Sequence, residues 1–352
     1  MNSVERVLTA LNHGKPDKVP FAYGYIHPSV REAVIGEKIE DRNHYRVNWS
    51  PTFLPGEKLT DLNPDESTDV RVARKLGLDA LGFQLLTPMM PLLERNEAGA
   101  NTIKGGLLRP ETLKDFKAGF PDTDDESLYK EAKEFVKKYK GEFALFCRIR
   151  LGFSPTLTSI GTKACIDMVH NEPDFVKEVV DFYAEWMKGH IRNLQEIGFD
   201  FFWSFDDIAD KNGPFFTSEE LREVFLPYLM KPAKEIKIPW IFHSDGELFS
   251  VIDDLMTLGM NGLHPLEPGS MDLRKLKREY GKKLCLVGNI EMKHIMKDAS
   301  KEEVDEYIRD CMEVLGPEGG YIIADSNQVP AGSTAENMLM ISESVMKQRM
   351  IY

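Results

Sequence analysis

The chain has 352 residues, of which 42% are hydrophobic and 29% are charged, and its formal net charge is −13. An acidic balance without a block of Lys and Arg disfavours nucleic acid and anionic membranes as partners, and no apolar run approaches the ~18 residues of a membrane helix. The N-terminus lacks the basic and apolar regions of a signal peptide, and no Cys-x-x-Cys pair occurs, so we expect a cytoplasmic protein with reduced thiols.

The first third of the chain predicts scattered elements rather than a regular alternation. Helices are expected over 3–11, 68–76 and 124–139, strands over 19–23 and 79–84, and a hairpin around 102–108. The last of these helices carries acidic residues early and lysines late, which complements its dipole. Residues 28–65 contain several prolines and are predicted to be irregular. The segment 28–140 is therefore expected to hold long insertions.

From residue 143 onward, apolar strands and helices alternate regularly. Strands are predicted over 143–147, 201–205, 238–242, 262–264, 284–287 and 321–324. Helices are predicted over 155–196, from 217 onward, and over 247–258, 271–279, 301–315 and 333–347. Two of them begin with the spacing of a capping box, at Thr217 with Glu220 and at Ser300 with Glu303. The strands are continuous apolar runs, which is typical of parallel sheets covered on both faces.

About eight strand–helix units can be assigned, which favours an α/β fold of the (β/α)₈ TIM barrel type with N-terminal helical and irregular insertions. We expect one barrel domain over residues 1–352. The main alternative is a doubly wound sheet, which would usually carry a glycine-rich loop after its first strand. The residues after Tyr23 read Gly24-Tyr25-Ile26-His27-Pro28 and contain no such loop.

In a (β/α)₈ barrel the active site lies at the carboxyl ends of the strands. We therefore searched for polar residues directly after each apolar run. They are Tyr23, Tyr25, Gln84, Arg148, Arg150, Asp206, Asp207, His243, Asp245, Glu247, His264, Glu267, Asn289, Glu291, Asp325, Ser326 and Asn327. This many titratable groups at one rim indicates a functional site.

The segment His243-Ser244-Asp245-Gly246 is the most informative part of that rim. Residues two apart on an extended chain point the same way, so His243 and Asp245 can converge on one ion. A neutral imidazole nitrogen and a carboxylate oxygen both suit Zn²⁺. The structural alternative is a strand-end histidine bonded to a backbone carbonyl, with Asp245 capping the next helix.

Two further acidic segments follow strands. Asp206 and Asp207 would raise each other's pKa if they were close and dry, and one could act as an acid or bind substrate or metal. Otherwise they belong to a solvated loop that starts a helix, and Asp325-Ser326-Asn327 alone would be an Asx turn. The four cysteines are expected to be packed thiols: Cys147, Cys165, Cys285 and Cys311.

Taken together, these segments resemble the uroporphyrinogen decarboxylase superfamily. The resemblance rests on His243-Ser244-Asp245-Gly246, on the run Leu263-His264-Pro265-Leu266-Glu267-Pro268, on Val287-Gly288-Asn289-Ile290-Glu291, and on Asp206-Asp207 with Phe225-Leu226-Pro227. It extends to the opening Glu5-Arg6-Val7 with Lys15-Pro16-Asp17 and to Leu315-Gly316-Pro317-Glu318-Gly319-Gly320, and it is weakest over 28–140. The resemblance implies a (β/α)₈ barrel, in agreement with the strand count.

The superfamily has two main activities. Its decarboxylases hold porphyrinogen propionates with arginines after the first strand, whereas this chain has no arginine there before Arg31. Its corrinoid-dependent methyltransferases of the thiol-methylating type bind zinc through His-x-Cys and a later Cys. Here the matching positions are His243, Asp245 and the region of Asp325, without sulfur. The resemblance then implies the methyltransferase I component of anaerobic O-demethylases.

The resulting hypothesis is a zinc-dependent methyltransferase that moves a methyl group from a methoxylated aromatic to the Co(I) of a corrinoid protein. We expect zinc on His243, Asp245 and Asp325, with Asp207 or Glu247 orienting substrate or supplying a proton. The expected substrate walls are Tyr23, Tyr25, Met89, Met90 and Trp203. The alternatives are a decarboxylase, methyl transfer from methanol or a methylamine, and a non-enzymatic scaffold subunit. Homodimer formation is left open.

Overall fold

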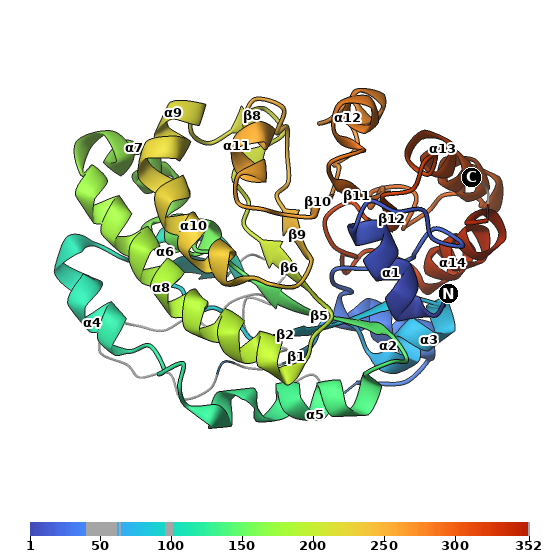
Figure 1. Ribbon diagram of the computed structural model, residues 1–352, viewed down its shortest axis with the longest axis horizontal. Helices are drawn as coiled ribbons and strands as arrows, with labels where there is room; N and C mark the ends of the chain where they lie inside the picture. The colour runs from blue at the N-terminus through green and yellow to red at the C-terminus, as the bar shows by residue number, and fades with distance from the viewer. Residues whose placement is uncertain (40–61, 63–64, 96–100, 351–352) are drawn as a thin grey trace.

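The computed structural model describes residues 1–39, 62, 65–95 and 101–350, and these form the predicted (β/α)₈ barrel (Figure 1). One continuous sheet contains seven parallel strands, with the two-residue antiparallel strand β1 (Asp65–Glu66) at its edge. The parallel strands are, in spatial order, β2 (Ala80–Gln84), β5 (Ala144–Ile149), β6 (Phe201–Phe205), β9 (Trp240–His243), β10 (Gly262–His264), β11 (Cys285–Ile290) and β12 (Tyr321–Asp325).

The predicted strand 19–23 is reduced to a single parallel bridge between Phe21 and Ile323 of β12. Ala22 donates its N–H to the Ile323 carbonyl and Ile323 donates to the Pro20 carbonyl, both at 3.0 Å, while Asp79 donates to the Phe21 carbonyl at 2.7 Å. The segment therefore lies between β12 and the start of β2 and closes the barrel. It is no full strand because Pro20 has no N–H and the N–H of Phe21 goes to the Asp79 side chain instead.

Alternate residues of β2, β5, β6, β9, β11 and β12 face the barrel interior and form one compact apolar cluster. Its strand members are Ala80, Ala144, Phe146, Phe201, Trp203, Phe205, Ile241, Cys285, Val287, Ile322 and Ala324. Helix α1 (Ser3–Leu11) adds Val7, Ala10 and Leu11 to the same cluster and contacts β2, β5 and β12. Since α1 lies next to the amino ends of these strands, it closes that end of the barrel.

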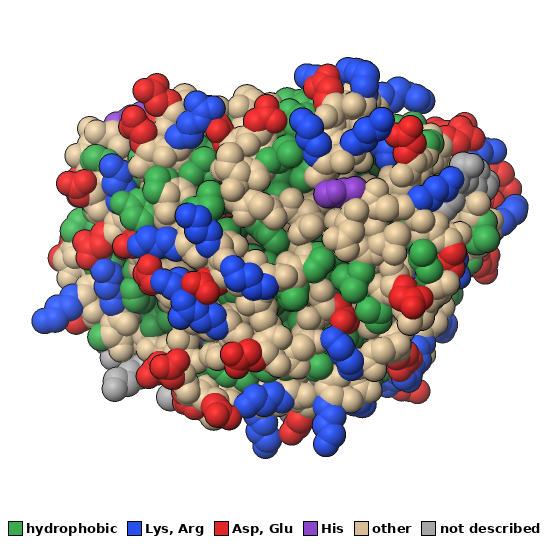
Figure 2. All heavy atoms as spheres, viewed as in Figure 1, with side chains coloured by type: hydrophobic (Ala, Val, Ile, Leu, Met, Phe, Trp, Pro, Cys, Tyr) green, Lys and Arg blue, Asp and Glu red, His purple; other side chains and the backbone are tan. Residues whose placement is uncertain are grey.

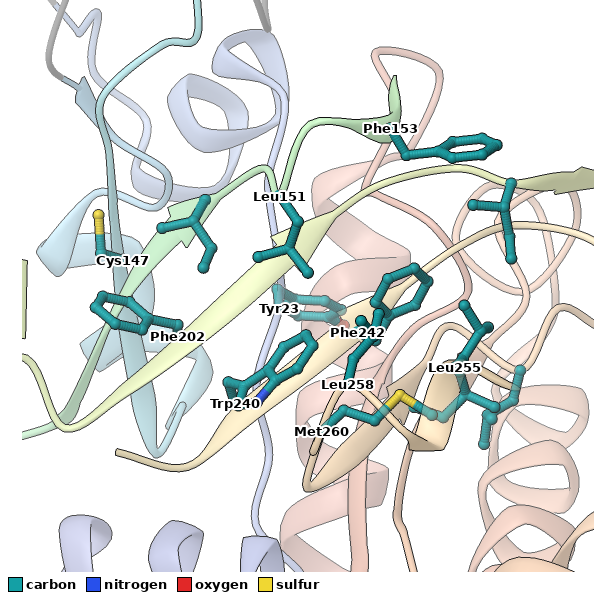
Figure 3. Close-up of a cluster of buried hydrophobic side chains, with 14 of the residues drawn as sticks. Tyr23, Cys147, Leu151, Phe153, Phe202, Trp240, Phe242, Leu255, Leu258 and Met260 are labelled. Atoms are coloured by element: carbon teal, nitrogen blue, oxygen red, sulfur yellow. The ribbon is translucent and has the colours of Figure 1, made fainter. Parts of the chain in front are cut away.

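The other strand residues face outward and pack under the surrounding helices. Figure 3 shows Phe202 of β6 and Trp240 and Phe242 of β9 in this layer, next to Leu255 and Leu258. All of these side chains are buried, as expected for a barrel whose strands are covered on both faces.

The helices after residue 150 follow the predicted order. They are α6 (Phe153–Ile160), α7 (Thr162–Asn171), α8 (Pro173–Ile197), α9 (Ser218–Glu220), a π-helical turn (Leu221–Phe225), α10 (Leu226–Glu235), α11 (Ile252–Met256), α12 (Leu273–Tyr280), α13 (Lys301–Leu315) and α14 (Ala335–Gln348). Figure 1 shows the long α8 beside α10 and the C-terminal pair α13 and α14 beside each other. Both predicted capping boxes, at Thr217 and Ser300, are present. A small antiparallel pair, β7 (Ala209–Asp210) and β8 (Gly213–Pro214), follows β6.

The segment 28–140 contains several short elements in its described parts. These are α2 (Pro28–Ile35), α3 (Val70–Leu76), a hairpin of β3 (Pro91–Arg95) and β4 (Asn101–Gly106), a 3-10 turn (Pro110–Thr112), α4 (Leu113–Ala118), a second 3-10 turn (Glu126–Tyr129) and α5 (Lys130–Tyr139). The hairpin lies earlier in the chain than the predicted 102–108 and shares only β4 with that segment. The prediction of irregular structure from residue 28 was wrong for α2, because Pro28 suits a first helical position and His27 caps the N–H of Ser29. The rest of the irregular segment, over 40–61 and 63–64, lies outside the described residues.

Acidic and basic side chains are interspersed over the face drawn in Figure 2. Within the described ranges, no helix combines the length and apolarity needed to cross a membrane. The four cysteines are buried free thiols, as predicted. Burial raises the pKa of each of them, which keeps them protonated.

Candidate active site

The site residues continue the inward-facing positions of the strands past the strand ends. In β6 the inward residues Phe201, Trp203 and Phe205 are followed, two positions on, by Asp207. By the same spacing, Ile241 in β9 leads to His243 and Asp245, and Phe146 in β5 leads to Arg148 and Arg150. This period of two brings the five polar side chains to one end of the barrel. They line one cavity of about 350 Å³.

His243, Asp207 and Asp245 form the centre of the site. The Nε2 atom of His243 lies 3.2 Å from Oδ1 of Asp207 and 3.7 Å from Oδ1 of Asp245. One nitrogen or oxygen atom from each residue lies within 4.8 Å of both others. Ligands at zinc distances and tetrahedral angles are about 3.4 Å apart, so this spacing suits one ion between the three atoms.

Hydrogen bonds determine which nitrogen of His243 carries a proton. The Nε2 atom of His264 lies 2.9 Å from the Asp325 carbonyl, which can only accept, so this nitrogen carries the N–H. Burial lowers the pKa of His264 well below its ordinary value, so its Nδ1 keeps a lone pair. The Nδ1 of His243, 2.6 Å away, must then be the donor.

This chain of bonds leaves a lone pair on Nε2 of His243, which faces Asp207 and Asp245. Strand register supports the arrangement, because His264 pairs directly with His243 across β10 and β9, and Phe205 pairs with His243 across β6. The Phe205 ring stacks on the imidazole at 4.5 Å between centroids. The imidazole is therefore held on two sides, and its ligand nitrogen points at two carboxylates.

Asp245 supplies the atom that best indicates a bound cation. Its Oδ2 accepts a hydrogen bond from Nδ2 of Asn327, whereas its Oδ1 is buried and has no hydrogen-bond partner among the described residues. Burial raises the pKa of Asp245 to about 7, and the negative charges of Asp207 and Glu267 add to the effect. A buried carboxylate oxygen without a donor has a high free energy unless a cation neutralises it.

The neighbouring carboxylates of Asp206 and Asp207 have separate environments. Asp206 faces away from the cavity and accepts hydrogen bonds from Ser204 Oγ and from the backbone N–H groups of Leu151 and Ser154, at the start of α6. Burial raises the pKa of Asp207, but its contact with His243 and the charge of Arg150 outweigh burial and lower the pKa below its ordinary value. The expectation that the pair would raise each other's pKa was therefore wrong for Asp207.

Gly246 redirects the chain after Asp245. Its φ of +91° is strained for other residues, and a Cβ atom here would lie 2.2 Å from the Asp210 carbonyl oxygen. Its N–H donates to Glu267 Oε2 at 3.1 Å. The next residue, Glu247, leaves the cavity, and its Oε1 accepts the Phe249 N–H at 2.7 Å. The predicted helix 247–258 is correspondingly short, since the segment before α11 forms this turn.

Asp325 is not part of the group around His243. It follows Ile323, which packs in the outward-facing layer, by two positions in β12, and its Oδ1 lies 3.9 Å from Nε2 of His264. Its Oδ1 accepts the N–H of Gly24 at 2.9 Å, and its Oδ2 is buried without a partner. Burial raises the pKa of Asp325 to about 7. Asp325 contributes to the site through its backbone carbonyl, which orients His264.

The five predicted substrate walls lie near the site but outside the cavity lining. Tyr23, Met89, Met90 and Trp203 are fully or almost fully buried, and Trp203 packs edge-on against the His264 ring. The Tyr25 ring lies 5.3 Å from the guanidinium carbon of Arg148. Their substrate role stays a prediction.

Several lining residues were not predicted from the sequence as site residues. They are Ser154, Leu157, Thr158, Thr162, Phe215 and Gln328. Most of them come from α6 and the start of α7, whose position over the strand ends follows from packing rather than from a motif. Arg148, Arg150 and Asn327 were at the predicted rim, without an assigned role.

The atoms that could bind a metal at this site are of the kinds that zinc prefers. One imidazole nitrogen and two carboxylate oxygens converge, a combination that zinc accepts with a fourth position for water or substrate. The unpartnered Oδ1 of Asp245 is the atom that a cation would satisfy. His264 provides the second hydrogen-bonded ring that usually orients a metal-binding histidine. The residues present therefore fit a zinc ion.

Comparison with known proteins adds a family and a fold. The uroporphyrinogen decarboxylase (URO-D) family model matches residues 126–348, which is more than half of the chain. No curated protein matches the sequence. A methyltransferase from Methanosarcina mazei has a similar structure, with a TM-score of 0.74, 15% identity and 99% of each chain covered. A B12-independent methionine synthase from Shewanella sp. W3-18-1 is more distant, with a TM-score of 0.44, 10% identity, and coverage of 76% of this chain and 71% of the synthase.

Proposed function

Because the chain belongs to the uroporphyrinogen decarboxylase family, we propose that it is a zinc-dependent methyltransferase that moves a methyl group from an aryl methyl ether to the cobalt of a corrinoid protein. The observation that carries the proposal is the sulfur-free group of His243, Asp207 and Asp245 at the carboxyl end of the barrel. The shared fold with a methyltransferase of 15% identity is consistent with it.

The absence of sulfur in this group favours an oxygen substrate over a thiol. Nitrogen and carboxylate ligands make a harder zinc site than thiolates do, and a harder ion suits an ether oxygen. In the described part of the chain the four cysteines are buried, and none belongs to the group around His243. In this proposal Asp207 is the third ligand, in place of the predicted Asp325.

Porphyrinogen decarboxylation is less well supported. That substrate carries several carboxylates and needs arginines to hold them. The first arginine after the closing segment is Arg31, which is buried and donates to the carbonyls of Ile26 and Glu66. Its guanidinium carbon also lies 5.3 Å from the Tyr25 ring. The arginines that line the cavity are Arg148 and Arg150 from β5, not arginines that follow the first strand.

In the proposed reaction the bond between the methyl carbon and the ether oxygen breaks. Two electrons of Co(I) in the acceptor form the new carbon–cobalt bond, the pair of the broken bond stays on oxygen, and the phenolate takes up one proton. Zinc bound at this site would stabilise, as a Lewis acid, the oxygen that gains charge. His243, Asp207 and Asp245 would hold the ion, and Asn327 would keep Oδ1 of Asp245 directed at it.

The remaining lining residues position the substrate. Phe205, Leu157 and Phe215 provide apolar walls that exclude water from the reacting bond. Proton donation to the phenolate stays open between water and the predicted residues Asp207 and Glu247. Of these two, only Asp207 lines the cavity.

Metal analysis with an activity assay tests the proposal. Purified protein should hold one zinc per chain and form methylcobalamin from cob(I)alamin and a methoxylated aromatic. Asp245→Asn and His243→Ala should lower zinc content and reduce methyl transfer more than about 100-fold, beyond the usual effect of an outer-shell change. Asp115→Asn, at an exposed site in α4, is the matched control and should change neither.

A preparation that binds no zinc and forms no methylcobalamin with any methoxylated aromatic would contradict the proposal. Methylcobalamin formed only from methanol or a methylamine would keep the enzyme class and replace the substrate. Binding of a corrinoid protein without any methyl transfer would favour a scaffold.

A further inference from the structure

The carboxyl group of Asp325 is a buried charged group to which the proposed function gives no role. Its side chain has no exposed surface. Its Oδ1 accepts the N–H of Gly24 at 2.9 Å, and its Oδ2 has no hydrogen-bond partner among the described residues. One hydrogen bond does not offset the free energy of burying a carboxylate. Packing alone therefore gives no reason for an acidic side chain at this position.

Asp325 contacts His264 in two ways. Its backbone carbonyl accepts the Nε2–H of His264 at 2.9 Å, and its Oδ1 lies 3.9 Å from the same nitrogen. Both side chains are fully buried, so water does not screen the charge of the carboxylate from the ring. A negative charge on this side favours the proton on Nε2 of His264 and adds electron density to Nδ1. The Nδ1 atom of His264 then becomes a stronger hydrogen-bond acceptor.

His264 transmits this effect to His243. The two Nδ1 atoms lie 2.6 Å apart, with the proton on His243, and Nε2 of His243 faces Asp207 and Asp245. In a chain of buried hydrogen bonds each bond polarises the next. A carboxylate bonded directly to a metal-binding histidine strengthens that ligand. Here a second imidazole lies between the carboxylate and the ligand.

Packing holds the chain in line. The Trp203 ring packs edge-on against the His264 ring, with 4.7 Å between centroids, and the Phe205 ring stacks on His243. Gly24 lies over both aromatic rings, since a Cβ atom on it would lie 3.2 Å from Cζ of Phe205 and 3.5 Å from Cζ2 of Trp203. Neither imidazole can turn without displacing these neighbours. The carboxyl group that binds the Gly24 N–H therefore has a fixed place relative to both rings.

We propose that the carboxylate of Asp325 is a positioning residue for the metal site, which acts through His264 and makes Nε2 of His243 a better ligand for a cation. The inference rests on the proposed function for the identity of the ion. Burial raises the pKa of Asp325 to about 7, and a cation at the site would lower it, which favours the carboxylate. The charge could also act on the cation directly through space. The two explanations differ in whether His264 is required.

A double-mutant cycle separates these explanations, with zinc affinity measured by competition with a chromophoric chelator. Asp325→Asn keeps an oxygen for the Gly24 N–H and removes the charge, so zinc affinity should fall about tenfold, the lower end of what the loss of an outer partner costs. In a His264→Gln background, the same substitution should change the affinity less than about twofold, because the connecting ring is gone.

Asp200→Asn is the matched control. The Asp200 carboxylate is also largely buried and accepts a strand N–H, that of Leu145, but it lies at the amino end of the barrel. Its substitution should leave zinc affinity unchanged. Circular dichroism melting checks the fold of each variant.

Nuclear magnetic resonance of metal-free protein with ¹⁵N-labelled histidines gives a second measurement. The wild-type protein should carry the proton of His243 on Nδ1 and that of His264 on Nε2. Asp325→Asn should move the Nδ1–H resonance of His243 upfield, since His264 becomes a weaker acceptor, and Asp200→Asn should not. The opposite tautomer of either ring in the wild-type protein would overturn the inference without any variant.

Equal losses of zinc affinity from Asp325→Asn in the two backgrounds would show a direct effect of the charge and overturn the inference. If methyl transfer occurs in that case, the proposed function stays intact. Zinc binding with the expected dependence on His264, but no methyl transfer to cob(I)alamin, would support this inference and contradict the proposed function.

Discussion

The Nδ1 atoms of His243 and His264 lie 2.6 Å apart on neighbouring parallel strands whose register pairs the two residues directly. One proton lies between them, and the Asp325 carbonyl on the far side of His264 assigns it to His243. His264 therefore sets the tautomer of His243 without touching the proposed ion. It acts as a positioning residue.

Replacing His264 should weaken metal binding while leaving the fold in place. In His264→Leu, the Nδ1–H of His243 loses its acceptor and the ring can rotate, so zinc affinity should fall about 10- to 100-fold. The measurement is competition with a chromophoric chelator. His264→Gln keeps a side-chain acceptor and should recover part of the affinity.

The control for this experiment is His170→Leu, since the His170 side chain is 61% exposed on α7. It should leave zinc affinity unchanged. Equal affinities for wild-type protein and His264→Leu would show that His243 is oriented by something other than this bond.

Gly246→Ala should damage the site through the backbone. The new Cβ would lie 2.2 Å from the Asp210 carbonyl oxygen at a φ of +91°, so the turn that carries Asp245 must shift. We expect a loss of about 1–3 kcal/mol in the free energy of unfolding and a loss of zinc. Gly259→Ala has a similar φ of +84° with nothing within 4 Å, and should cost stability without losing zinc. Retention of zinc by Gly246→Ala would contradict the account of this turn.

Asp79 should be the most sensitive position at the closed end of the barrel. Its carboxylate is buried and pairs with Arg6 at 2.6 Å and Arg349 at 2.8 Å, and it accepts the Phe21 N–H. Asp79→Asn leaves the buried Arg349 without its counter-charge and leaves Arg6 with only the half-exposed Asp17, so it should lower the free energy of unfolding by about 3–5 kcal/mol. Unfolding in urea measures this loss of free energy. Asp17→Asn removes a half-exposed partner of Arg6 and should cost about 1 kcal/mol or less; equal losses would contradict this view.

His190 should make the protein less stable in mild acid. The ring is buried in α8, its Nδ1 lies 2.7 Å from the Tyr129 hydroxyl and its Nε2 has no partner, so burial lowers its pKa to about 3. Below pH ~6.5 the unfolded chain binds a proton here and the folded chain does not. Stability should therefore fall by about 1.4 kcal/mol per pH unit as the pH drops from ~6 towards 3.

Unfolding free energies between pH 4 and pH 7 test this prediction. His190→Leu removes the titrating group, so its stability should depend less steeply on pH than that of the wild-type protein. His170→Leu, on the exposed part of α7, should keep the wild-type slope. Parallel slopes for wild-type protein and His190→Leu would assign the acid sensitivity to other groups.

Much of the site follows from a period of two that can be read in the sequence. The inward residues Phe205 and Ile241 lead to Asp207 and to His243 with Asp245, and these are the residues that meet. Asp325 continues the other set of positions, with Ile323, and its Oδ1 accepts the N–H of Gly24 instead of joining the group around His243. Asp325 was predicted as a ligand because it follows the last strand and matches a ligand position of the family. That prediction did not take into account which face of the strand each residue occupies.

Other features depend on contacts that no local pattern contains. Phe21 forms a bridge rather than a strand because the distant Asp79 carboxylate takes its N–H. The turn at Gly246 packs against Asp210 of β7, whose carbonyl accepts the N–H of Glu247 at 3.2 Å. The cavity wall from α6 is set by how that helix packs across the strand ends. Sequence patterns predicted the fold and the polar residues at the carboxyl ends of the strands. Long-range contacts determine which of those residues come together in the site.

Helix α1 seals the amino end of the barrel with Val7, Ala10 and Leu11. If the proposed reaction takes place, the methyl donor and the cobalt of the acceptor would both have to reach His243 from the carboxyl end of the barrel, as far as the described residues define it. A docked corrinoid protein would cover the route by which the ether arrives and the phenol departs. Steady-state kinetics should accordingly show a compulsory order, with the small molecule binding before the protein partner and leaving after it.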